Sequence, residues 1–224
     1  MTLDTNTVLF LPGLGSRPDP WDEQLSALPD GFAGLAPEIP GLDQAGTPGG
    51  FTFVGAARAL CDLLDQQGVE RAHLCGLSLG GMVATQFTLD FPERVASLVL
   101  SGSQARPHPV LMRIARRGVR LLPERAARSR WMTKAMWLGA LQVISEVNFR
   151  GRLASIHAPT LVLCGSRDLV NLPAARELAA TIPNAKLRIV PRVGHPWNHQ
   201  QPELFSRTIA EFYAGLPSEG SHHG

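Results

Sequence analysis

Cysteine is scarce in this chain of 224 residues, which has only three: Cys61, Cys75 and Cys164. An odd number of cysteines in apolar surroundings excludes a disulfide framework as the basis of the fold. Their spacing is also unlike that of zinc ligands, so they suggest neither metal nor redox chemistry. We expect three buried free thiols and a site that uses no metal and no organic cofactor.

Long apolar runs are absent as well. The N-terminus has no basic start followed by an apolar core, and no run approaches the ~20 residues that span a bilayer. These absences predict a soluble, cytoplasmic protein without a secretory signal. There is no internal repeat, and the one biased segment is the polar stretch 218–224, which we predict to be a disordered tail.

Apolar residues nevertheless make up 44% of the chain, enough for one sizeable core. Short apolar runs ending in Gly or Pro alternate with segments of helical period, which is typical of repeated βα units and a parallel sheet. We predict an α/β fold with strands at 7–11, 32–36, 72–75, 95–100, 160–164 and 186–190. Helices are predicted at 19–28, 53–67, 80–90, 174–180 and 201–214.

One stretch interrupts this alternation. Residues 106–152 form a mainly helical insertion between two predicted strands, so the core is expected to comprise 1–105 and 153–217, with 106–152 as a lid. The insertion holds eleven basic and two acidic residues, a formal charge of +9. The remainder holds ten basic and seventeen acidic residues, a formal charge of −7, so the total of +2 conceals a separation of charge.

Part of this charge recurs at helical spacing, in Arg113, Arg116, Arg117 and Arg120. The opposite helix face carries Leu111, Ile114, Ala115 and Leu122, so one interpretation is the solvated outer face of a lid helix. The other is an electropositive mouth that attracts an anionic substrate. Contact of this helix with an anionic membrane is less favoured. Nucleic acid is not expected as a partner, because no recognised binding motif is present.

The segment Cys75 to Met82, CGLSLGGM, contains the pattern G-x-S-x-G after a strand-like run and before a helix-like one. This is the context of a nucleophile elbow, a sharp turn that exposes a serine at the carboxyl end of a strand. Gly76 and Gly80 would leave room around the turn, where a Cβ would clash and the backbone needs φ > 0. A serine hydroxyl is a weak nucleophile, so Ser78 also requires a histidine base and a group that orients it.

Both partners follow further along the chain. Asp168 comes just after the predicted strand 160–164, and His195 lies in the Gly-His-Pro turn before the last helix. The order Ser78, Asp168, His195 is the order of the triad in hydrolases with this kind of elbow. The nearest rival for the base is His199, whereas His73 lies inside an apolar strand and is interpreted as a buried, hydrogen-bonded histidine.

From Val8 to Phe212 the sequence resembles the α/β-hydrolase family. Besides the three catalytic matches, the resemblance is carried by Leu11 to Gly15, Trp21 to Leu25, Phe91 to Val95 and Pro202 to Phe205. It implies the backbone N–H groups of Leu14 and Leu79 as an oxyanion hole. The segment Gly76 to Met82 is similar to that of small esterases and lactonases, including enol-lactone hydrolases.

The chain departs from the family pattern in two places. Pro12-Gly13 stands where the family commonly has His-Gly, which keeps the glycine turn but removes a histidine that holds the loop. Too few residues precede Val8 for the two strands that usually come first, so we expect a trimmed sheet of six parallel strands with helices on both faces.

The segment from Trp131 to Leu141 is apolar almost all round and must be covered on several sides. In the resembling family it would form the roof of an acyl or ring pocket, with Met136 and Trp137 as candidates for substrate contact. The same residues could also be simple packing within the lid.

The sequence therefore predicts a serine hydrolase acting on a small carboxylic ester or lactone through an acyl-enzyme, without cofactor. Two alternatives stay open. One is a cofactor-free perhydrolase, lyase or cyclase on the same fold, and the other is a ligand-binding receptor or scaffold with little turnover.

Overall fold

The computed structural model describes residues 6–16, 21–47, 50–127 and 131–216. Six parallel strands form one sheet in the order β2-β1-β3-β4-β5-β6. They are β1 (Asn6–Leu11), β2 (Phe32–Leu35), β3 (Ala72–Leu77), β4 (Val95–Ser101), β5 (Thr160–Gly165) and β6 (Ala185–Val190). The predicted six-stranded parallel sheet is confirmed. The predicted tail 218–224 lies outside the described residues.

The helices alternate with the strands as predicted. They are α1 (Asp22–Ser26), α2 (Phe53–Gln66), α3 (Leu79–Asp90), α4 (Pro109–Leu121), α5 (Glu124–Ala127), α6 (Lys134–Glu146), α7 (Leu172–Thr181), α8 (Trp197–Gln200) and α9 (Pro202–Ala214). Short 3₁₀ helices cover Leu42–Gln44, Pro92–Arg94 and Leu153–Ser155. None of the helices in the described part of the chain has the length and apolar character needed to cross a membrane.

Two helical predictions differ from the structure. The helix predicted at 19–28 has its first two residues outside the described part, and α1 ends at Ser26. It stops early because Leu28 precedes Pro29, a position where the proline ring disfavours helical backbone. The four-residue α8 was not predicted, since so short a helix shows no recognisable period.

The helices cover both faces of the sheet and create two apolar cores. On one face α2, α3 and α7 enclose a core that contains Leu74, Val83 and Leu178. On the other, α1, α8 and α9 enclose one that contains Trp21 and Phe205. Helix α3 is buried along nearly its whole length, because it lies between the sheet and the neighbouring α2. The layers hold the strands rigidly, and the carboxyl ends of all six meet at one edge of the sheet.

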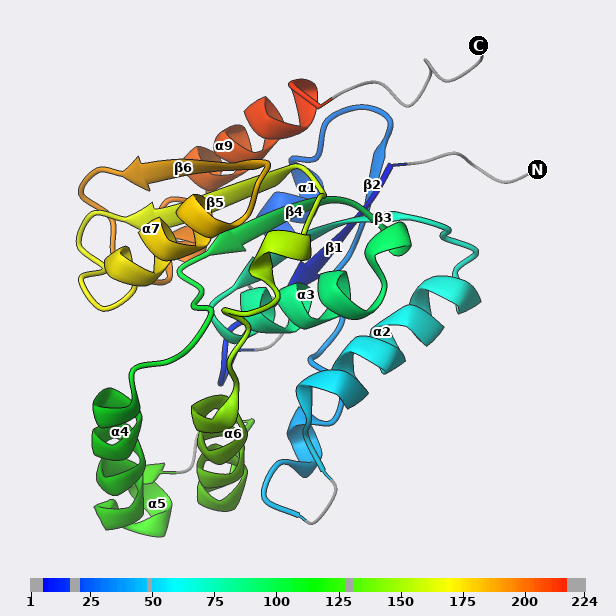
Figure 1. The fold of residues 1–224 in the computed structure, drawn as a ribbon. Helices are drawn as coiled ribbons and strands as arrows, with labels where there is room; N and C mark the ends of the chain where they lie inside the picture. The colour runs from blue at the N-terminus through cyan, green and yellow to red at the C-terminus, as the bar shows by residue number, and fades with distance from the viewer. Residues whose placement is uncertain (1–5, 17–20, 48–49, 128–130, 217–224) are drawn as a thin grey trace.

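Helices α4, α5 and α6 follow β4 and precede β5 along the chain, and they project away from the sheet (Figure 1). The side of α4 opposite the arginines is exposed: it carries Leu111, Ile114 and Ala115, and Leu122 directly after the helix is exposed too. The half-buried row is instead Met112, Arg116 and Val119, spaced as one face of the helix, and α4 packs against α6. Arg113, Arg117 and Arg120 are exposed, as the interpretation of a solvated outer face requires, but the opposite leucine side is exposed as well.

Buried polar and sulfur groups behave as the sequence predicted. All three cysteines are buried free thiols. His73 is also buried, and its Nδ1 lies 2.8 Å from Ser97 Oγ on the adjacent strand β4, within hydrogen-bond distance. Burial, aided by the charge of Arg71, lowers the pKa of His73 to about 4.

This pKa predicts a stability that depends on pH. Between about pH 6.5 and about pH 4 the unfolded chain binds a proton at His73 that the folded chain does not bind, so the free energy of unfolding falls as the pH falls. We expect wild type to lose about 1 to 2 kcal/mol more than His73→Asn between pH 7 and pH 5, measured by urea unfolding. The exposed His157→Asn is the control and should behave as wild type. Equal losses in wild type and His73→Asn would contradict the burial of a neutral imidazole.

Candidate active site

Ser78 forms the turn between β3 and α3 with a backbone that non-glycine residues rarely adopt, φ 54° and ψ −114°. Such a conformation costs about 1–3 kcal/mol and persists only where the surroundings hold it. Here the Ser78 N–H donates to the Ser101 carbonyl on β4 at 2.8 Å, and the Ser78 carbonyl accepts from the Met82 N–H at 3.1 Å. The backbone is fixed on both sides, while Ser78 Oγ makes no hydrogen bond to a described residue.

The two glycines of the motif permit close backbone approach. A Cβ on Gly80 would collide with the carbonyls of Leu11 and Pro12, and one on Gly76 would collide with the backbone of Gly80 and Gly81. Neither glycine has positive φ, which corrects the expectation that the glycines supply the left-handed backbone. Ser78 itself supplies it, and the glycines provide the space.

The structure brings Asp168 and His195 together. They lie in the loops that follow β5 and β6, and His195 Nδ1 is 2.6 Å from Asp168 Oδ2. The Asp168 side chain is 6% exposed and that of His195 is 37% exposed, so the carboxylate is hidden behind an imidazole that solvent reaches. His199 lies in α8 and makes no hydrogen bond to Asp168, so the contact selects His195 over its rival.

A second donor to this carboxylate was not predicted. The Asn171 Nδ2 group lies 2.8 Å from both Asp168 carboxylate oxygens. Gln104 Nε2 in turn donates to Asn171 Oδ1 at 2.5 Å, which fixes the orientation of the amide. Asn171 stands at the start of α7, three residues after Asp168, and its side chain does not cap that helix. Its position in the sequence, three residues after the candidate carboxylate, is the feature that could have indicated this role for Asn171.

These contacts set the charge of Asp168. Burial alone would raise the pKa of Asp168, but the hydrogen bonds from His195 and Asn171 outweigh it and hold the pKa below its ordinary value. The group is therefore ionised near neutral pH and accepts the His195 Nδ1–H. This fixes the imidazole tautomer with Nε2 free to accept a proton.

Ser78 and His195 are both positioned by the carboxyl end of β4. Gly102 has φ 56°, and a Cβ there would lie 2.8 Å from His195 Nδ1, so the imidazole rests directly on this residue. The preceding residue, Ser101, accepts the Ser78 N–H. The structure contains no hydrogen bond between Ser78 Oγ and His195.

The candidate oxyanion donors lie beside the serine. Gly13 packs against Ser78, since a Cβ on this glycine would be 3.6 Å from Ser78 Cβ. Leu14 follows in that loop, and Leu79 is the first residue of α3. Neither of their backbone N–H groups donates to a described residue. A helix N-terminus and a glycine loop thus leave free donors near Ser78.

Of the two candidate substrate contacts, Trp137 reaches the loop that carries Leu14. Its ring covers Gly15, where a Cβ would be 2.7 Å from Trp137 Cη2. Met136 turns back instead, and its Sδ accepts from the Thr133 N–H at the start of α6. Elsewhere in the described ranges no three His, Cys, Asp or Glu side chains gather as a metal site requires.

Known proteins have sequences similar to this one. The sequence profile of the alpha/beta hydrolase family matches residues 8–208. A protein of Variovorax paradoxus (strain S110), named "Putative carbamate hydrolase RutD", is 29% identical over 97% of this chain and 95% of its own length.

Solved structures are also similar. The crystal structure of a hydrolase from Pseudomonas aeruginosa PA01 has a TM-score of 0.80 and 25% identity, covering 93% of this chain and 90% of that one. The enol-lactonase from Burkholderia xenovorans LB400 has a TM-score of 0.80 at 21% identity, covering 94% and 92%, and shows the likeness of fold. Because the family profile spans most of the sequence, this chain belongs to the alpha/beta hydrolase family.

Proposed function

We propose that the protein is a serine hydrolase that cleaves a small carboxylic ester or lactone through an acyl-enzyme on Ser78. The observation that carries the proposal is the buried Asp168 carboxylate held against His195, at the same end of the sheet as the strained turn of Ser78. A structural serine turn would need neither a distant buried carboxylate nor an imidazole with one nitrogen free.

The reaction runs in two halves. His195 Nε2 takes the Ser78 proton as Oγ attacks the substrate carbonyl, and Asp168 stabilises the resulting imidazolium. The carbonyl oxygen gains negative charge and accepts hydrogen bonds from the Leu14 and Leu79 N–H groups, each worth about 10²–10³ in rate in other enzymes. His195 then gives the proton to the leaving alkoxide oxygen. Water attacks the acyl-enzyme with His195 as base and releases the acid and Ser78.

The missing Ser78–His195 hydrogen bond is compatible with this cycle, because such bonds are often long in the free enzyme and tighten with substrate. The partly exposed His195 side chain leaves room for that adjustment. Residues 106–152 would act as the lid, with Trp137 as part of the roof above the oxyanion loop. Met136 is the weaker candidate for substrate contact, since its sulfur binds its own helix.

Carbamate hydrolysis is a second candidate, favoured by the name of the RutD relative. A carbamate carbonyl would be attacked by the same groups, so only substrate comparison separates the two. A panel of p-nitrophenyl esters of several chain lengths, lactones and aryl carbamates tests this directly. Turnover of none of them would favour a receptor or scaffold, and conversion without hydrolysis would favour a lyase, cyclase or perhydrolase.

Ser78→Ala should abolish ester turnover while the melting temperature stays close to that of wild type, because the hydroxyl forms the covalent bond. Asp168→Asn should lower kcat about 10⁴-fold, the penalty of a wrong imidazole tautomer. Steady-state kinetics with p-nitrophenyl butyrate measures both. A Ser78→Ala variant with wild-type kcat would refute the proposal that Ser78 is the nucleophile.

Asn171→Ala should lower kcat about tenfold to a hundredfold with little change in KM, because the carboxylate loses a donor worth about 1.5–3 kcal/mol. In an Asp168→Asn background the same change should cost almost nothing, since Asn171 acts through that carboxylate. The exposed Asn148→Ala is the control. Full additivity of the two changes would limit Asn171 to a structural role.

The positive charge of the insertion leads to a separate prediction about how salt affects the turnover of anionic substrates. If the exposed Arg113, Arg117 and Arg120 attract an anionic substrate, kcat/KM for an anionic ester should fall with rising salt, while a neutral ester of equal size changes little. Replacing these three and Arg116 by Gln should remove most of that salt dependence. Equal salt responses of the two esters would show that the arginines form a solvated surface and do not attract the substrate.

A further inference from the structure

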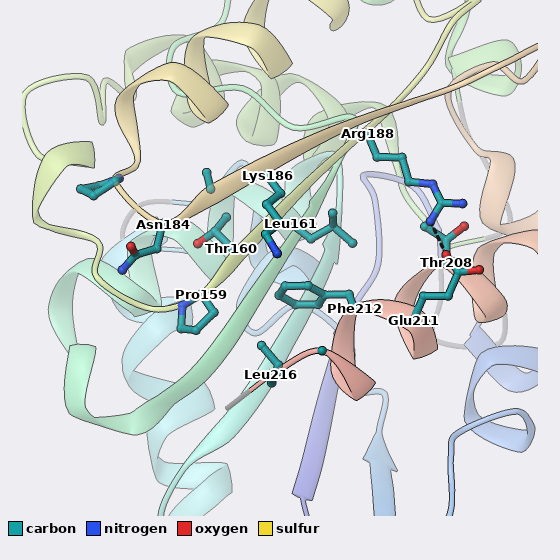
Figure 2. A pocket seen from close by; sticks show the side chains of 13 residues that line it. Pro159, Thr160, Leu161, Asn184, Lys186, Arg188, Thr208, Glu211, Phe212 and Leu216 are labelled. Atoms are coloured by element: carbon teal, nitrogen blue, oxygen red, sulfur yellow. Dashed lines mark hydrogen bonds and ion pairs between the residues drawn. The ribbon is translucent and has the colours of Figure 1, made fainter. Parts of the chain in front are cut away.

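A hollow in the surface lies far from the candidate active site. It is an open trough of about 720 Å³ between the sheet and the end of α9 (Figure 2). Its lining consists of Pro159, Thr160, Leu161, Pro183, Asn184, Ala185, Lys186, Arg188, Thr208, Glu211, Phe212, Gly215 and Leu216. We refer to it as the α9 trough.

The trough is at the opposite end of the sheet from Ser78. Thr160 and Ala185 are the first residues of β5 and β6, whereas Asp168 and His195 follow the last residues of the same strands. The six residues of β5 span about 20 Å at ~3.3 Å each. A molecule in the trough would not touch the candidate triad.

One part of the lining is apolar and partly open to water. Leu161 forms the floor on the sheet, and the Phe212 ring points toward it from α9, with Leu216 and Pro159 at one end (Figure 2). Leu161 is 6% exposed, while Phe212 and Leu216 are half-buried. Covering such apolar surface is favourable, and the volume is within the ~300–1,000 Å³ of small-molecule sites.

The charges of the lining do not balance. Lys186 and Arg188 project on the same side of β6, because they are two residues apart on one strand. Arg188 Nη1 is paired with Glu211 Oε2 at 2.6 Å, and Glu211 is the one acidic residue among those lining the trough. Lys186 forms no ion pair or hydrogen bond with a described residue. One positive charge is left beside an apolar floor.

We propose that the α9 trough binds a small amphipathic monoanion, with its negative group at Lys186 and its apolar chain or ring against Leu161 and Phe212. Lys186 is exposed and solvated, so a neutral molecule of the same shape would bind without the ion pair that an anion gains there. A small anion without an apolar body would not cover the floor. Medium-chain and arylalkyl monocarboxylates combine both features.

The chain provides a direct probe of this site, because Lys134 and Lys186 are its only two lysines. Reductive ¹³C-methylation keeps the lysine charge and yields two side-chain NMR signals. Lys134 serves as internal control, since its Nζ donates to the carbonyls of Arg120 and Leu122 in the insertion. The Lys186→Gln variant assigns the signals.

Titration with decanoate, below its micelle-forming concentration, should shift the Lys186 signal saturably and leave the Lys134 signal in place. Decanamide and acetate should bind at least fivefold more weakly, since each lacks one of the two features. Phe212→Gln should weaken decanoate binding, and Glu211→Gln should strengthen it by freeing Arg188.

An unmoved Lys186 signal would overturn the proposal. So would equal responses of that signal to decanoate and to decanamide. Because the Lys186 signal reports the trough alone, decanoate bound above Ser78 as a product analogue cannot be mistaken for binding at this second site.

Discussion

The close approach of three backbone segments around Ser78 is the constraint on which the site depends. β3, the start of α3 and the loop after β1 meet where only glycine fits at positions 76 and 80. Within that space Ser78 is held at positive φ by hydrogen bonds to Ser101 and Met82. The same turn that strains the serine directs α3 beneath it and leaves the Leu79 N–H unpaired. Strain, exposure of the hydroxyl and the free donor are therefore consequences of one packing arrangement.

The parallel sheet then assembles the remaining groups. β4, next to β3, ends at Ser101 and Gly102, which contact Ser78 and His195 respectively. β5 and β6 follow in order, so their loops deliver Asp168 and His195 to the same edge. Gln104, just beyond β4, reaches Asn171 and through it the carboxylate. The chain of polar contacts thus crosses three loops, each fixed by its own strand.

Much of this arrangement could be predicted from the sequence. Alternating apolar runs and helical periods gave the six strands, and the spacing of Ser78, Asp168 and His195 at strand ends gave the contact between the last two. Residue types at strand ends suffice here because parallel strands share one edge. The apolar runs and helical periods that determine the fold are local and repeated along the chain, so they can be recognised in the sequence alone.

Other features depend on side-chain directions that a pattern does not contain. The helical spacing in α4 did not show that Met112, Arg116 and Val119 form its half-buried row, while the leucine side opposite the arginines is exposed. Asn171 was missed because its role arises from a contact with Asp168, not from its helix position. The α9 trough joins residues from β5, β6 and α9, and only the folded chain brings these together.

Ser78 is the proposed nucleophile, activated by its surroundings, and covalent labelling measures that activation directly. The folded protein is treated with a fluorophosphonate, digested and examined by mass spectrometry, with urea-unfolded protein as the comparison. One adduct per chain, on the peptide that contains Ser78 and absent from unfolded protein, is the predicted result. An adduct on a different residue, or none on a folded chain, would contradict the assignment of the active site.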